Sequence, residues 1–264
     1  MSFLGYAFMQ RALIAGALIG ATAGAMGVYV VLRGLSFIGA GIAHAAFGGV
    51  AIAVLLGIDP LWGALAFSLL VAWGIVHASR RGRLREDVAI GILFASAMAL
   101  GVLLLSLVPG YRGDLFGYLF GNILAVSPRD LVASIALAGA VFLAVSLLYK
   151  EFLLITFDPG AAEAQGFPVV ALQGGLLSLV ALTVVLSLRV VGAVLAAALL
   201  VIPAATAYQF VRNFHRLLLL STALGVGEVI AGLVISFYLD VPSGPAIVLL
   251  SAALFAAATA ARRR

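Results

Sequence analysis

Long uncharged, apolar stretches follow one another along almost the whole chain, and single charged residues or short charged runs separate them. Within these stretches apolar residues do not alternate with polar ones, which excludes the strands of a membrane β-barrel. A helix needs about 20 consecutive apolar residues to cross the hydrocarbon core of a bilayer. The stretches of about that length are 12–32, 34–58, 60–79, 88–111, 131–149, 164–188, 190–211, 217–239 (interrupted by Glu228) and 241–261. The pattern predicts an all-α membrane protein with nine transmembrane helices, and eight is the nearest alternative.

Two smaller features add detail to this bundle. Residues 115–128 are uncharged but too short to cross a bilayer, so we expect a partial or interfacial helix there. Gly16, Gly20 and Gly24 recur at four-residue spacing in the first stretch, which lets a neighbouring helix approach closely. Packing inside the bundle is the favoured interpretation, and a subunit interface is the alternative.

Composition agrees with a membrane location. Of the 264 residues, 65% are hydrophobic and 9% are charged, whereas a soluble domain has about 45–50% apolar and about 25% charged residues. A soluble enzyme is therefore excluded. No change of composition marks a linker, so residues 1–264 are expected to form a single transmembrane domain. The chain has no cysteine, which excludes disulfides, thiolate metal sites and a cysteine nucleophile.

The distribution of cations predicts the orientation. With the C-terminus inside, the nine spans place eleven cations on the cytoplasmic side and four outside, in agreement with the positive-inside rule. The cytoplasmic cations are Arg33, Arg80, Arg81, Arg83, Arg85, Lys150, Arg212, Arg216, Arg262, Arg263 and Arg264. The outer cations are Arg11, Arg112, Arg129 and Arg189. The N-terminus is therefore expected outside.

Missing motifs narrow the function. The only lysine, Lys150, is followed by Glu151, so the chain contains no phosphate-binding loop of the G-x-x-x-x-G-K-[ST] type. It also lacks the H-E-x-x-H helix of zinc proteases and the G-x-S-x-G turn of hydrolases. We therefore expect a protein that is not an enzyme and that does not hydrolyse ATP itself.

The loop after the fifth stretch carries the signals of a short helix. Asp158 suits a helix N-cap, Pro159 suits the first helical position, and Gly166 and Pro168 provide a stop. These signals predict a short cytoplasmic helix over 158–166. It is either a rigid contact through which a soluble partner transmits force or a structured turn, and local sequence leaves both open.

Three ionisable residues within or beside the spans are candidate functional residues, because charged groups inside a membrane are usually functional. His44 lies in the second stretch, with a packing histidine as the alternative. Glu228 lies in the middle of the eighth, where an unpaired carboxylate costs about 2.5–3.5 kcal/mol, so it should face the bundle interior; a structural hydrogen bond or ion pair is the alternative. Asp240 precedes Pro242 and Gly244, and turn chemistry alone could explain it.

Four stretches together resemble the permease subunit of ABC importers for zinc and manganese, in the order found in that family and over nearly the whole chain. They are residues 31–39 running into Ala43-His44-Ala45-Ala46, Glu151-Phe152 with Phe157-Asp158-Pro159, residues 198–207, and Asp240-Val241-Pro242-Ser243-Gly244. The resemblance implies the fold of vitamin- and metal-chelate-type importer permeases. It also implies a multi-pass protein of a prokaryotic cell membrane that works as a homodimer.

The same resemblance implies three kinds of partner and a cargo. A cytoplasmic ATPase would dock on the helix near 158–166, an extracytoplasmic protein would deliver the metal, and a second copy of the chain would complete the permease, with no nucleic acid and no permanent cofactor. The cargo would be a divalent metal, zinc favoured over manganese. The coupling residues would be Asp158, Pro159, Ala161, Ala162 and Gly166. A stand-alone secondary transporter or channel, or an ABC permease for an iron chelate, are the alternatives.

Two positions depart from the family pattern. Gly160 stands where the family commonly has Glu, and Ala40 stands where it often has Asp, four residues before the histidine. Positions 40 and 44 share one helical face, so Ala40 removes an oxygen ligand from beside His44. Any carboxylate partner must then come from elsewhere. We expect His44 to face the central pathway near the dimer axis with Asp240 above it, and Glu228 to face the bundle interior.

Overall fold

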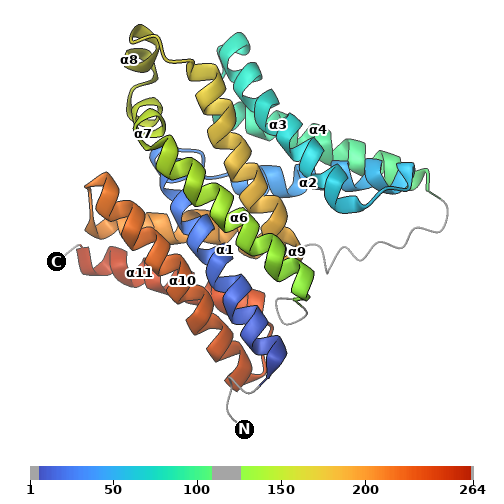
Figure 1. Cartoon of the computed structure of the whole chain (residues 1–264), viewed down its shortest axis with the longest axis vertical. Coiled ribbons are helices and arrows are strands. Elements are labelled where there is room, and N and C mark those ends of the chain that lie inside the picture. Colours follow the sequence, from blue (N-terminus) through green and yellow to red (C-terminus); the bar gives the residue numbers. More distant parts are fainter. Residues whose placement is uncertain (1–5, 109–125, 263–264) are drawn as a thin grey trace.

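The computed structural model describes residues 6–108 and 126–262, and within these ranges it contains helices and no strand. The helices are α1 (Ala7–Leu32), α2 (Ile38–Leu56), α3 (Pro60–Gly82), α4 (Glu86–Ser106), α6 (Pro128–Leu147), α7 (Tyr149–Phe157), α8 (Pro159–Ala164), α9 (Val169–Phe210), α10 (Phe214–Leu239) and α11 (Ser243–Arg262). α2, α3 and α4 gather on one side of α9, and α1, α10 and α11 lie on the other (Figure 1).

The described residues contain nine helical segments long and apolar enough to cross a membrane, which confirms the predicted number. Two of them, Val169–Leu188 and Val190–Phe210, belong to α9. The chain turns between them at Gly192, whose φ of +79° is a backbone conformation that favours glycine. The partial helix expected over 115–128 falls almost entirely on residues 109–125, outside the described part of the chain.

Helix ends differ from the predicted span ends because helices begin at capping residues and not at the edge of apolar runs. α6 starts at Pro128 behind Ser127, whose side chain accepts from the backbone N–H of Asp130. α4 starts at Glu86 and includes Asp87 in its first turn, where carboxylates are favourable beside the positive end of the helix. The short helix α7 was not predicted, because the residues from Lys150 to Phe157 were interpreted as a loop between two spans.

Small residues bring α1 and α10 into direct backbone contact. A Cβ atom at Gly24 would lie 2.5 Å from the carbonyl oxygen of Ser221, and one at Gly20 would overlap the carbonyl of Gly225. The Ser221 hydroxyl donates to the Gly24 carbonyl oxygen at 2.6 Å inside this contact. The glycine stripe of the first span therefore serves packing inside the bundle, as favoured from the sequence.

Ion pairs gather several helix ends on one face of the molecule. Arg33, at the end of α1, donates to Glu86 at the start of α4 at 2.5 Å. Arg80, near the end of α3, lies 3.8 Å from Glu163 of α8 and donates to the Gln173 side chain of α9 at 3.3 Å. All of these segments are ones that the cation count assigns to the cytoplasmic side. We refer to this end of the molecule as the charged face.

Candidate functional site

α2 and α4 run side by side in the same direction. Glycines in α2 allow the close approach of the two helices. A Cβ atom at Gly41 would lie 2.7 Å from Ile90 Cγ2, and one at Gly48 would lie 2.8 Å from the Ala97 carbonyl oxygen. Residue numbers increase together along the two helices, so both start at the charged face. The first turns of α2 are thus level with the first turns of α4.

A cavity of about 420 Å³ lies between these first turns and contains His44. Its lining residues occupy positions i, i+3, i+4 and i+7 on each helix, which form one helical face. They are Phe37, the N-cap of α2, with Ala40, Gly41 and His44 from α2, and Asp87, Ile90, Gly91 and Phe94 from α4. We call this space the His44 cavity.

His44 is half-buried and is held by two contacts. Its Nδ1 lies 2.8 Å from the carbonyl oxygen of Ala40. A carbonyl oxygen only accepts, so Nδ1 is the donor, and in the neutral imidazole Nε2 is the nitrogen whose lone pair could bind a metal. The ring also meets the Phe94 ring edge to face, with centroids 5.2 Å apart and an interplanar angle of 85°. Ala40 therefore orients the imidazole through its backbone, although it supplies no carboxylate.

Asp87 is the carboxylate that shares the His44 cavity, and it was not predicted from the sequence. Its Oδ1 atom is buried and makes no hydrogen bond. The residue belongs to the charged run 80–87, which was interpreted only as a boundary between spans. A sequence signal existed, since Glu86 and Asp87 directly precede an uncharged span, but only the packing of α4 against α2 brings Asp87 into the cavity that contains His44.

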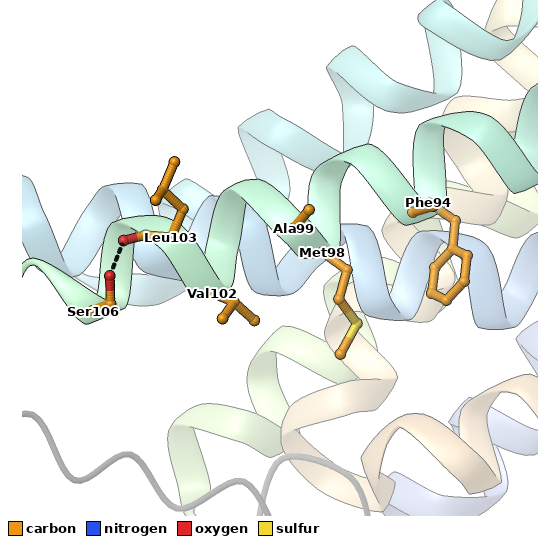
Figure 2. Close-up of a pocket in the computed structure, with 7 residues that line it drawn as sticks. Phe94, Met98, Ala99, Val102, Leu103 and Ser106 are labelled. Atoms are coloured by element: carbon orange, nitrogen blue, oxygen red, sulfur yellow. Dashed lines mark hydrogen bonds between the residues drawn. The ribbon is translucent and has the colours of Figure 1, made fainter.

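A second groove of about 580 Å³ continues from the His44 cavity along α4. Figure 2 shows the side chains that line it, all from α4. They are Phe94, Ala95, Met98, Ala99, Val102, Leu103 and Ser106. Phe94 lines both spaces. From Asp87 to Ser106 the helix rises about 29 Å at 1.5 Å per residue, close to the thickness of about 30 Å of a bilayer core. We call the two spaces together the α4 groove.

The other two candidates lie elsewhere in the chain. Glu228 on α10 is 1% exposed, so it faces the interior of the bundle. This orientation was predicted because an unpaired carboxylate that faces lipid costs free energy. Its carboxylate oxygens make no hydrogen bond of standard geometry; the polar neighbour is Ser251 of α11, whose hydroxyl donates to Ile247 at 2.9 Å. Asp240 is exposed and ends α10 in the left-handed conformation, with φ of +52°. Within one chain, neither lines the His44 cavity.

The helix expected over 158–166 is present as α8 and has the expected signals. The Asp158 side chain accepts from the backbone N–H of Ala161 at 2.8 Å, Pro159 is the first helical residue, and Gly166 follows the helix with φ of +83°. The buried side of α8 is Ala162, which is 0% exposed and packs in the main core of the chain. Ala162 therefore offers no surface to a partner, contrary to the contact expected of it.

The surface beside α8 that a partner can reach is formed by other residues. Phe157, the last residue of α7, is 63% exposed, and Asp158, Pro159 and Gly160 follow it as exposed residues. On the far side of the helix, Glu163 lies 3.8 Å from Arg80, which connects α8 to α3. A large exposed aromatic side chain beside a short capped helix is a typical contact point for a protein partner.

Nine apolar spans, an intramembrane groove with two ionisable side chains, and a short helix on the charged face define a multi-pass membrane transport protein. The chain belongs to the ABC 3 transport family, whose model matches residues 5–262. It is therefore a membrane permease of the ABC transporter class.

Named relatives and one solved structure resemble the chain over most of its length. The manganese import system permease protein ScaB of Streptococcus gordonii is 42% identical over 94% of this chain and 89% of its own. The manganese transport system membrane protein MntC of Halalkalibacterium halodurans is 41% identical over 97% and 87%. The chelated iron transport system membrane protein YfeD of Yersinia pestis is 37% identical over 96% and 85%. The structure of PsaBC from Streptococcus pneumoniae in complex with Fab matches with a TM-score of 0.84 and 36% identity, over 97% of this chain and 92% of that one.

Proposed function

We propose that this chain is the permease subunit of an ATP-driven importer for a divalent transition metal, and that the metal is manganese. The single observation that carries the proposal is the α4 groove. It joins an oriented histidine and a carboxylate with one buried, unpaired oxygen to an open groove along α4, which is about as long as a bilayer core is thick. A groove open to lipid on one side needs a second copy of the chain to close it, in keeping with a homodimeric permease.

Manganese replaces zinc, the metal favoured from the sequence, for two reasons. The relatives ScaB and MntC are named for manganese. In addition, the lining of the His44 cavity includes a carboxylate, and carboxylate, carbonyl and water ligands suit manganese, whereas zinc prefers sites rich in nitrogen and sulfur. The chain has no cysteine that would favour zinc.

Energy would come from a separate ATPase, because the sequence contains no phosphate-binding loop. We place the contact on Phe157 and on the exposed start of α8 at Asp158, Pro159 and Gly160. Motion at this contact would reach the bundle through the buried Ala162 and the Arg80–Glu163 pair. Ala161 and Gly166 shape the helix through its cap and its end.

The proposal is tested by manganese uptake into cells that lack their own manganese importers and that express the chain with its ATPase and metal-binding protein. We expect uptake that requires all three proteins, that stops when ATP is depleted, and that excess manganese inhibits more strongly than excess zinc. Uptake by the chain alone, driven by a proton gradient, would instead identify a secondary transporter. Uptake of an iron chelate in preference to free manganese would favour the function named for YfeD.

A further inference from the structure

Asp87 is a half-buried residue that lines the His44 cavity, and the family resemblance gives it no role. Its Oδ1 is buried and has no hydrogen-bond partner. The adjacent carboxylate, Glu86, is instead engaged by Arg33 at 2.5 Å. Of two neighbouring acids at the start of α4, one is therefore neutralised by a cation, and the other lines a cavity without one.

The packing register of α2 against α4 places Asp87 closer to the charged face than His44. His44 lies against Phe94, and Gly41 lies against Ile90. Asp87 precedes Phe94 by seven residues, which is about 10 Å along the helix. The Asp87 backbone therefore lies about two helical turns nearer to the charged face than the level at which His44 meets Phe94. Asp87 and His44 are therefore two successive positions along one groove.

On the basis of the function proposed above, we infer that Asp87 is a separate binding position for the divalent cation, between His44 and the charged face. An ion leaving the imidazole loses a ligand inside a low-dielectric region, where an uncompensated charge is costly. A carboxylate two turns further on lowers that barrier. Conduction requires several sites of moderate affinity, and no described cluster of three or more His, Asp or Glu side chains could retain the ion tightly.

The alternative role of Asp87 is purely structural, because a carboxylate in the first turn of a helix interacts favourably with the helix dipole. That role predicts a change in protein stability but no change in the apparent affinity for manganese. The two roles are separated by transport kinetics at several manganese concentrations, with membrane abundance measured for each variant.

We expect Asp87→Asn to raise the KM for manganese uptake by about tenfold, as loss of a metal-supporting group does, and Asp87→Glu to restore most of the affinity. The matched control is Asp59→Asn. Asp59 caps α3 from an exposed position, accepting from Leu61 N at 2.8 Å, and asparagine is an equally good cap. Its KM should equal that of the wild type.

Because the chain contains no cysteine, Asp87→Cys introduces a single thiol that reports on the same position without transport. In inside-out membrane vesicles this thiol should react with a charged methanethiosulfonate, and Cd²⁺ should protect it. Arg81→Cys, an exposed position on the same face, should react with no protection by Cd²⁺.

A wild-type KM in Asp87→Asn, in an importer that His44→Ala impairs, would overturn the inference while leaving the proposed function intact. Labelling of Asp87→Cys that Cd²⁺ does not change would overturn it as well. If the wild-type importer takes up no divalent metal, the proposed function has failed. Cd²⁺ protection of Asp87→Cys would then still support a cation site at this position.

Discussion

The imidazole of His44 is oriented by the backbone carbonyl of Ala40. The family often has an aspartate side chain at position 40. The Ala40 carbonyl accepts from Nδ1 and leaves Nε2 without this bond, so a residue without a polar side chain still orients the imidazole. His44 could be singled out from the sequence because it is an ionisable residue inside an apolar stretch. Asp87 could not, because its partner helix lies far away in the chain and only tertiary packing brings the two together.

The first prediction at this scale concerns His44 itself. His44→Ala should lower manganese uptake by about tenfold or more, because the groove loses its nitrogen ligand, while membrane abundance stays unchanged. The matched control is His77→Ala, since His77 is exposed on α3 and lines no described part of the α4 groove. Radioactive manganese uptake measures both. Equal uptake by the wild type and His44→Ala would contradict a role in the pathway.

A second prediction concerns the position that departs from the family pattern. Ala40 lines the same cavity, one helical turn from His44 toward the charged face. Ala40→Asp should therefore be tolerated. It should change the ratio of manganese to zinc uptake, because it adds a carboxylate on the helical face that carries His44. Competition between the two metals measures the ratio. Loss of the protein from the membrane would show that the cavity does not accommodate the extra carboxylate.

At the scale of elements, the charged residues that separate the apolar stretches were sufficient to predict nine spans but not all helix ends. The cap at Asp158 and the stop at Gly166 predicted α8 because their chemistry is local. The same reasoning failed for the orientation of α8, since which side of a short helix is buried depends on its neighbours. Ala162 was expected at the surface and is instead part of the core.

Ala162 is buried and Phe157 is exposed, so substitutions at these two positions should have different effects, one on protein abundance and the other on coupling to ATP hydrolysis. Phe157→Glu changes a side chain that is 63% exposed, so it should leave the permease in the membrane but reduce metal-dependent stimulation of ATP hydrolysis. Ala162→Glu places an unpaired charge in the core and should lower abundance instead. Quantitative blotting and ATPase assays on purified complexes measure the two outcomes. Normal abundance and normal coupling in both variants would argue against α8 as the contact.

At the scale of the whole molecule, the ion pairs agree with the cation count. Segments assigned to the cytoplasm by charge, at Arg33, Arg80 and Glu163, lie together on the charged face. We therefore expect reporter fusions after Gly82 and after Arg264 both to report a cytoplasmic location, with the N-terminus outside. Paired alkaline phosphatase and fluorescent protein fusions provide the measurement. An external signal at position 82 would mean that the first third of the chain crosses the membrane a different number of times.

In a single chain the α4 groove is open along one side. The helix that lines it, α4, has the highest mean hydropathy of the described spans. Lipid could cover such a surface, but an ion moving along it would then face hydrocarbon, where a charge is expensive. A second copy placed across the groove removes this cost and gives each position of the pathway ligands from two chains. The groove therefore predicts which surface of the permease meets its copy.

A single cysteine tests this arrangement, because the chain has none of its own. Val102 lines the groove and is 55% exposed, and Leu249 on α11 is 69% exposed but lies in a different groove. With a short bifunctional maleimide, Val102→Cys should yield a crosslinked dimer in native membranes, and Leu249→Cys should remain a monomer. Both thiols are accessible, so a difference between them reports proximity to the second copy. Equal crosslinking at the two positions, or crosslinking at Leu249 alone, would place the dimer contact elsewhere and would leave α4 facing lipid.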